Sequence, residues 1–334
     1  MKKPVTIVVT QLEYEKGKVV FVSAEKEGLV CIPVPKDEIR IAESVRKYNA
    51  RHAILGDEMY TNELYHSLSR GGVLARFGVG YDGIDLSLAS SRMLFCTNTP
   101  GVLEESVAEL TIALIVSGAR HISELSDNMR KGVFSPILGI ELRGKKLAVI
   151  GCGAIGCKVA SIASAGFGMI VTGCEVRDMD VNAMKRDCGF TSITRDFTKA
   201  VSNADFVTLH IPSTPETFHF INSDRLSMLP DKAWLINTAR GAVVDENALY
   251  DALETGIIRG AALDVFEKEP YIPMNPAKDL RTLPRVILTP HAGSSTVEAC
   301  HRVAERVLLN ITHAERKEYQ KMNLLNPAVL ENLK

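Results

Sequence analysis

Three polar residues of this 334-residue chain, Arg240, Glu269 and His291, each come shortly after a short apolar run. The runs, in the same order, are 233–236, 260–263 and 286–289. Because parallel strands end at one edge of a sheet, we expect the three side chains to converge there. His291 can exchange a proton near working pH, Glu269 can favour its charged form, and Arg240 can bind a carboxylate in bidentate fashion. The set predicts proton transfer on a secondary alcohol or its ketone, as a hydride-transfer site needs.

A glycine-rich stretch upstream predicts a dinucleotide. Residues 147–150 are an expected strand, GCGAIG follows at 151–156, then a helix near 157–165 and a strand at 169–172. Gly151 permits the tight turn, Gly153 lets the backbone approach a pyrophosphate, and Gly156 lets the helix pack on the strand. The helix N-terminus favours phosphate. Glu175 can accept from both ribose hydroxyls, which favours NAD over NADP, although Arg177 two residues later weakens that preference.

Each of the three polar residues also has a plain structural interpretation. Arg240 could be a surface charge near a turn, and Glu269, beside Glu267, could be a solvated loop carboxylate. His291, between Pro290 and an Ala-Gly pair, could be a loop histidine with no catalytic role. Their recurrence at the sheet edge that would also hold a dinucleotide favours the catalytic interpretation.

Length and composition limit the class of protein. A chain of 334 residues predicts two domains, and 46% hydrophobic with 24% charged residues is typical of soluble globular proteins. A net charge of −1 indicates neither a nucleic-acid nor a membrane surface. The seven cysteines include no CxxC pair, which predicts reduced thiols in a cytoplasmic protein and neither disulfides nor a metal site.

Apolar runs alternate with helical periodicity along the chain, which predicts an α/β fold with parallel sheets. Segment 14–27 stays open, because its charges suit a helix whereas Val19 to Val22 suit a strand. A long helix over 103–131 is expected to bridge two domains and to offer an apolar face to a subunit interface. The other expected strands are 5–10, 29–34, 53–55, 73–76, 93–97 and 206–209, and the other expected helices are 36–49, 62–69, 85–92, 222–228, 246–254 and 296–316.

Six stretches together resemble the D-isomer-specific 2-hydroxyacid dehydrogenase family over nearly the whole chain. They are RFGVGYDGIDL (76–86), NTPGVLEESVAE (98–109), LRGKKLAVIGCGAIG (142–156), INTARGAVVDENAL (236–249), GAALDVFEKEP (260–270) and LTPHAGSST (288–296). The resemblance implies that Arg240, Glu269 and His291 are the catalytic arginine, glutamate and histidine.

The resemblance also implies the binding residues and the architecture. Cofactor contacts are expected at Gly151, Gly153, Ala154, Ile155, Gly156, Glu175, Pro212, Thr238, Ala239, Arg240, Asp264, His291 and Ser294. Substrate contacts are expected at Arg76, Val79, Gly80 and Tyr81. Two Rossmann-like domains with a cleft between them are implied: a discontinuous, flavodoxin-like catalytic domain (1–98 and 290–334) and a doubly wound NAD-binding domain (99–289). Such proteins are usually homodimers joined through the cofactor domains.

Some features leave alternatives open. The acid that ends the second cofactor strand is usually aspartate, and here it is Glu175; Cys152 stands where a larger apolar residue is common. Glu269 argues against the formate-oxidising branch, which has glutamine there. A phosphite-oxidising relative or an NAD-sensing corepressor remains the alternative to a dehydrogenase of a small D-2-hydroxy acid, whose identity stays open.

Overall fold

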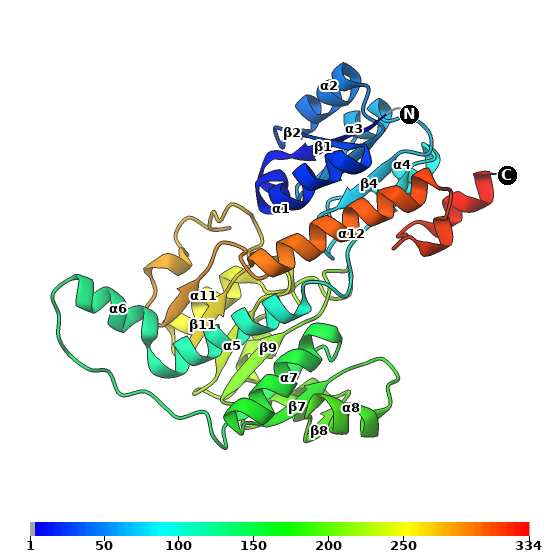
Figure 1. Cartoon of the computed structure of the whole chain (residues 1–334). Helices are drawn as coiled ribbons and strands as arrows, with labels where there is room; N and C mark the ends of the chain where they lie inside the picture. Colours follow the sequence, from blue (N-terminus) through cyan, green and yellow to red (C-terminus); the bar gives the residue numbers. More distant parts are fainter. Residues whose placement is uncertain (1–3, 334) are drawn as a thin grey trace. The chain divides into compact units, whose positions relative to one another are not determined.

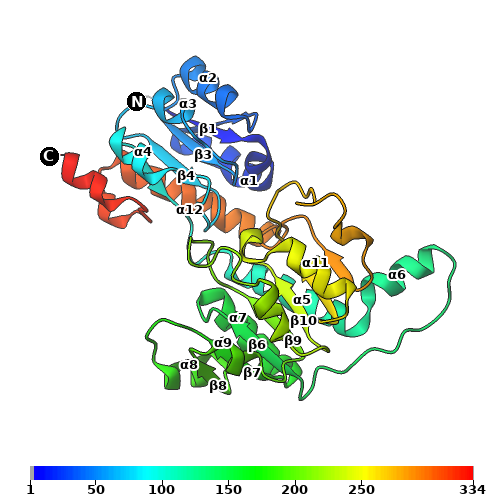
Figure 2. The ribbon, with the colours of Figure 1, turned by 180° about the vertical axis from the view of Figure 1, so that it is seen from behind.

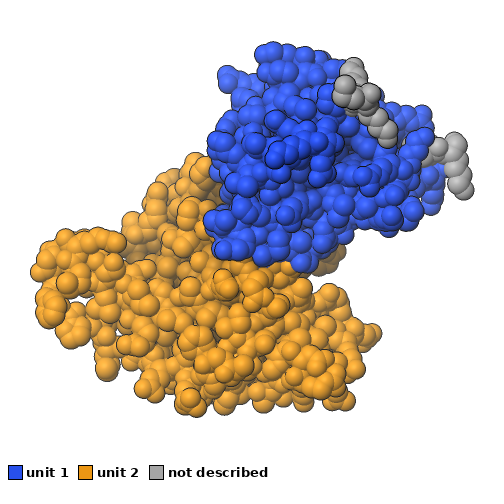
Figure 3. Space-filling model, in the orientation of Figure 1, with its two compact units in different colours: residues 1–103, 294–334 blue, residues 104–293 orange. Residues whose placement is uncertain are grey.

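The computed structural model describes residues 4–333, which divide into two compact units (Figure 3). Unit 1 contains the N-terminal part of the chain up to Leu103 and the C-terminal part from Ser294, and unit 2 spans Glu104–Gly293. The chain passes between the units a few residues later than the expected boundaries at 98 and 289. No helix within the described range is both long and apolar enough to cross a lipid bilayer.

The sheet of unit 1 has five parallel strands in the order β2-β1-β3-β4-β5, which is the flavodoxin-like order. Its strands are short apolar runs buried on both faces, as parallel strands covered by helices must be. The bounds are β1 Val5–Thr10, β2 Leu29–Val34, β3 His52–Leu55, β4 Val73–Arg76 and β5 Phe95–Thr97.

Helices cover both faces of this sheet (Figure 1). The first face bears α2 (Glu38–Tyr48), α3 (Glu63–Ser67) and α4 (Leu86–Ser91), whose apolar side chains join one core cluster. The other bears α1 (Gln11–Ala24) and α12 (Val297–Glu315), which pack on each other.

The open segment 14–27 lies mostly in α1, so the strand interpretation of Val19 to Val22 is wrong. Gly17, Phe21 and Ala24 share one helical face and are buried, whereas Val19 and Val22 are exposed. The buried residues are four and then three positions apart, which is the helical period.

The sheet of unit 2 has seven parallel strands in the order β12-β11-β10-β9-β6-β7-β8, the doubly wound order. The bounds are β6 Lys146–Ile150, β7 Ile170–Cys174, β8 Ser192–Thr194, β9 Phe206–Leu209, β10 Trp234–Asn237, β11 Gly260–Leu263 and β12 Val286–Leu288. The chain reverses its direction across the sheet between β6 and β9, the point at which such sheets bind ligands.

Two helical layers enclose this sheet (Figure 2). One core cluster lies under α5 (Glu104–Arg120) and α7 (Ala154–Phe167), with α8 (Val181–Cys188) at its margin. The opposite cluster lies under α9 (Phe197–Val201), α10 (Ser223–Ser227) and α11 (Glu246–Glu254). The short 3₁₀ helices are Glu25–Glu27, Gly241–Val243, Leu280–Thr282, Tyr319–Lys321 and Pro327–Leu333.

The single helix expected over 103–131 is wrong, because the chain forms two helices there. α5 ends at Arg120, and α6 spans Ile122–Arg130. His121 between them has a φ of 53°, in the left-handed region, where a right-handed helix cannot continue. α6 and the irregular segment after it extend away from the sheet of unit 2 (Figure 1).

Candidate active site

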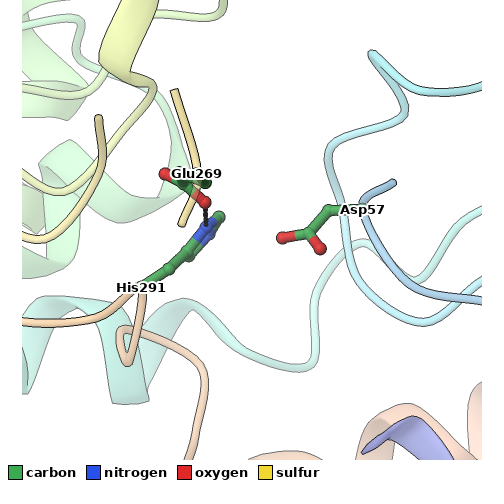
Figure 4. A group of neighbouring side chains, drawn as sticks. All are labelled: Asp57, Glu269 and His291. Carbon is green, nitrogen blue, oxygen red and sulfur yellow. Dashed lines mark hydrogen bonds and ion pairs between the residues drawn. The ribbon is translucent and has the colours of Figure 1, made fainter. Parts of the chain in front are cut away.

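Glu269 and His291 form a direct side-chain pair in unit 2. His291 Nδ1 and Glu269 Oε2 are 2.7 Å apart, and about one third of each side chain is exposed. The dashed line in Figure 4 marks this contact. The other carboxylate oxygen, Oε1, accepts a hydrogen bond of 3.0 Å from the Phe266 backbone. Asp57, the third residue labelled in Figure 4, belongs to unit 1. The pair therefore joins the loop after β11 to the loop after β12, with the carboxylate fixed at both oxygens.

Asp264 holds the loop that presents His291. Its Oδ1 accepts from Thr289 Oγ1 at 2.6 Å and from the Ala292 amide at 2.8 Å, and its Oδ2 accepts from the Gly293 amide at 2.8 Å. The His291 amide donates to the Asp264 carbonyl at 2.8 Å. Burial raises the pKa of Asp264, and these hydrogen bonds oppose the rise. The contact of Asp264 with a cofactor stays a prediction; its buried carboxylate bonds the loop of His291.

Arg240 lies on the neighbouring loop after β10. Its carbonyl accepts a hydrogen bond of 2.8 Å from the Asn237 side chain, which fixes the turn. A Cβ at the next residue, Gly241, would lie 1.8 Å from the carbonyl carbon of Phe266. Only glycine permits this approach of the two loop backbones. The loop of Arg240 thus lies directly against the loop that positions Glu269.

The glycine turn after β6 has the geometry of a phosphate-binding loop. Gly151 has a φ of 93°, and a Cβ there would lie 2.5 Å from the His210 carbonyl oxygen. A Cβ on Gly156 would lie 2.1 Å from the Gly151 carbonyl oxygen, so the start of α7 packs on the turn only because Gly156 has no side chain. A Cβ on Gly153 would meet nothing closer than Arg177 Nη2 at 3.7 Å, and would instead fill the space over the turn. The residues therefore fit a pyrophosphate at the N-terminus of α7.

Glu175, directly after β7, is engaged by a neighbouring arginine. Arg177 Nη2 donates to its Oε2 at 2.7 Å and Arg177 Nε to its Oε1 at 3.1 Å, while the Cys152 amide donates to Oε2 at 3.0 Å. The hydrogen bonds from Arg177 lower the pKa of Glu175 to about 2. The Glu175 side chain is 6% exposed, and that of Arg177 is 62% exposed. A ligand at this strand end therefore meets an ionised carboxylate whose charge is offset by the Arg177 guanidinium, which lies on the solvent side.

The other expected cofactor residues of unit 2 lie at the same sheet edge. Ala154 and Ile155 begin α7, and Pro212 follows β9. Thr238 and Ala239 follow β10, and the buried Thr238 hydroxyl is 2.9 Å from a threonine hydroxyl of α5.

The expected substrate residues, and Ser294, belong to unit 1. Arg76 ends β4, and its guanidinium donates to the Phe77 carbonyl. Val79 and Gly80 are half-buried in the loop that follows, and the Val79 carbonyl accepts from the Asn98 side chain at 2.8 Å. Tyr81 is exposed.

The sequence reasoning missed a carboxyl cluster behind the Glu269 loop. Glu246 and Glu267 hydrogen bond to each other's backbone amides, and His219 bonds Glu267. In the sequence, Glu267 stands out only as a neighbour of Glu269. The one available signal was a second acidic residue directly after Asp245, the N-cap of α11, where an acid usually only complements the helix dipole.

Known proteins resemble this chain over most of its length. The sequence profile described as "D-isomer specific 2-hydroxyacid dehydrogenase, NAD binding domain" matches residues 112–293. The chain is 37% identical over 304 residues to a glyoxylate reductase of Korarchaeum cryptofilum, covering 89% of this chain and 88% of that protein. It is 38% identical over 300 residues to a glyoxylate reductase of Thermococcus litoralis, covering 87% of each.

Solved structures agree as well. D-lactate dehydrogenase from Aquifex aeolicus, complexed with NAD and lactic acid, has a TM-score of 0.81 at 28% identity, covering 96% of this chain and 99% of that one. An NADPH-dependent glyoxylate/hydroxypyruvate reductase from Sinorhizobium meliloti, complexed with NADP and malonate, has a TM-score of 0.78 at 28% identity, covering 93% of each. The chain belongs to the D-isomer-specific 2-hydroxyacid dehydrogenase family.

Proposed function

We propose that this protein is an oxidoreductase that transfers a hydride between NAD(H) and a small D-2-hydroxy acid or 2-keto acid, with glyoxylate as the first substrate to test. The observation that carries the proposal is the 2.7 Å pair of His291 and Glu269 beside the loop of Arg240. The names of the related glyoxylate reductases support the choice of substrate.

In this proposal His291 moves the proton. Because Nδ1 faces Glu269, the exchange with substrate oxygen falls to Nε2. The imidazolium donates to the keto oxygen during reduction, and the neutral imidazole accepts the hydroxyl proton during oxidation; such catalysis is worth ~10²–10⁴ in rate. Glu269 stabilises the charged ring and fixes its tautomer. Arg240 binds the substrate carboxylate and polarises the adjacent carbonyl.

The nicotinamide dinucleotide supplies or accepts the hydride when bound. Unit 2 serves as its domain: the turn from Gly151 to Gly156 and the start of α7 hold the pyrophosphate, and Glu175 lies where the adenosine ribose is expected. We propose NAD as the preferred cofactor, because the Glu175 carboxylate repels a 2′-phosphate. NADP is a weaker cofactor in this proposal, because Arg177 offsets part of that repulsion. Relatives of both cofactor types support testing both.

Unit 1 serves as the substrate domain in this proposal. The loop after β4 contributes backbone amides at Val79 and Gly80 to the substrate carboxylate. Arg76 and Tyr81 adjust which substrate side chain is accepted.

The test is oxidation of NADH and of NADPH with a panel of glyoxylate, hydroxypyruvate, pyruvate and branched 2-keto acids, and reduction of NAD with phosphite. The expected result is consumption of NADH with one keto acid preferred. No turnover with any of them despite NADH binding would refute the proposal and favour a sensor. Turnover with phosphite alone would favour the other alternative. None of the described residues favours either alternative.

We also propose a homodimer joined through unit 2. Several apolar side chains on α6 and the segment after it are exposed, more than a lone subunit usually leaves in one place. They are Ile122, Met129, Val133, Phe134 and Leu138, and the last two are about nine-tenths exposed. Sedimentation of the wild type and of Phe134→Glu tests this; a wild type that sediments as a monomer contradicts it. A cytoplasmic location is proposed from the seven free thiols.

A further inference from the structure

A cluster of charged side chains lies directly behind the Glu269–His291 pair. Glu246, the first residue of α11, accepts from the Glu267 amide with Oε1 at 2.7 Å, and Glu267 Oε1 accepts from the Glu246 amide at 3.1 Å. These reciprocal bonds join α11 to the loop after β11. Phe266 and Glu269, on the same loop, share the 3.0 Å bond that fixes the catalytic carboxylate. Glu246 is therefore tied to the backbone that positions Glu269.

His219 closes the far side of the cluster. Its Nε2 is 2.8 Å from Glu267 Oε2, and its Nδ1 is 3.8 Å from the Asp245 carboxylate. Asp245 is already engaged as the cap of α11, where it accepts from two backbone amides. Glu267 thus has a hydrogen-bonding partner at each carboxylate oxygen. In the described part of the chain, Glu246 is the carboxyl group of the cluster that lacks such a partner at one of its oxygens.

Glu246 is 5% exposed, and its Oε2 has no hydrogen-bond partner among residues 4–333. An ionised carboxylate with a buried, unpaired oxygen is costly, and a proton on that oxygen removes the cost. Burial, together with the charges of Glu267, Glu269 and Asp245, raises the pKa of Glu246 to about 7. The titratable groups in and around the cluster are Glu267, Glu269, Asp245, His219 and Tyr271.

We propose that Glu246 is a positioning residue for the reaction, a buried carboxylic acid whose ionisation adds negative charge behind Glu269 and so keeps His291 protonated in alkaline solution. The proposal rests on the proposed function for the role of His291. Since reduction consumes the imidazolium, Glu246 extends the reductase activity toward higher pH. Below pH 7 its protonated form holds the Glu269 loop without adding a further anion to Glu267, Glu269 and Asp245.

The test is Glu246→Gln, because glutamine imitates the neutral acid and cannot ionise. In the pH profile of kcat/KM for keto-acid reduction, the alkaline limb is the range in which the rate falls as the pH rises. The midpoint of this limb should lie ~0.5 pH unit lower in the variant than in the wild type. NADH affinity should be retained. The matched control is Glu254→Gln, which removes an exposed carboxylate from the other end of α11 and should leave the limb in place. A Glu246→Gln profile that superposes on the wild type overturns the proposal.

Infrared spectroscopy tests the protonated carboxyl without any turnover. The wild type should show the carbonyl band of a carboxylic acid that disappears as the pH is raised through about 7, and Glu246→Gln should lose it. Absence of the band from the wild type overturns the proposal even if the variant does not fold. Presence of the band in a protein that reduces no keto acid refutes the proposed function alone, and leaves Glu246 as a buried acid.

Discussion

Removal of the Arg177 guanidinium should separate the affinities for the two nicotinamide cofactors. In Arg177→Ala, Glu175 loses the donors at 2.7 and 3.1 Å and keeps the Cys152 amide at 3.0 Å. In the proposed complex the carboxylate would then face the ribose with its full charge. A 2′-phosphate carries up to about two negative charges. In the variant it would lack the attraction of the Arg177 guanidinium and would be repelled by the Glu175 carboxylate. NADPH binding should weaken, whereas NADH binding should hold or improve.

The exposure of Arg177 sets the magnitude. Two unit charges about 4 Å apart interact by ~4 kcal/mol at the effective dielectric of a protein surface. Because 62% of the arginine side chain is exposed, solvent and salt reduce this to about 1.4 kcal/mol. That energy corresponds to a factor of about ten in an equilibrium constant. The ratio of the NADPH Kd to the NADH Kd should therefore rise about tenfold.

Fluorescence titration of NADH and NADPH at low and at high salt measures this ratio. The matched control is Arg281→Ala, because Arg281 is similarly exposed and bonds Asp279, also two residues away, through Nε and Nη2. The control should leave the ratio unchanged. The reasoning is refuted if Arg177→Ala shifts both affinities equally, since Arg177 would then not read the 2′ position.

Three further outcomes are expected. His291→Asn, which tolerates the left-handed φ of 51°, should cut kcat by ~10²–10⁴ while fluorescence still reports NADH binding; an unchanged kcat would exclude His291 as the acid. Gly241→Ala should lower the free energy of unfolding in urea by ~2 kcal/mol or more, because the added Cβ would overlap the backbone of Phe266. The control Gly166→Ala, whose Cβ meets no atom within 4 Å, should not lower it. Equal urea midpoints for the two variants would contradict the observed loop contact. The pKa of Glu175 is lowered from 4.5 to about 2, so its ionised form stabilises the fold above pH 4.5, and this stability is lost as the pH falls from 4.5 to about 2. In acid unfolding, Arg177→Ala should therefore lose less stability over this range than the wild type. Identical acid profiles would argue against the ion pair.

Local pattern sufficed for most elements of this fold. The strands 5–10, 29–34, 73–76, 206–209 and 260–263 have the observed bounds, because short apolar runs between turn residues leave few other structures open. The glycines at 151 and 156 were predictable from the local motif: Gly151 has the positive φ of the turn, and Gly156 packs closely against the Gly151 carbonyl. The places of Arg240, Glu269 and His291 after three strands were predictable in the same way, and the family resemblance added the role expected of each.

Local pattern failed where distant contacts decide. α1 is helical because Phe21 packs within unit 1, and the helix predicted through His121 breaks at a residue whose left-handed backbone no periodicity reveals.

The sequence by itself determined the α/β class, the glycine turn after β6 and the loops that bear the polar residues. The tertiary structure alone decided that Asp264 bonds the His291 loop and that Glu246 has a buried oxygen without a partner among residues 4–333. Hydrogen bonds between side chains on separate strands depend on sheet order and register, and burial depends on every element around a group. Neither is encoded in the spacing of residues along the chain.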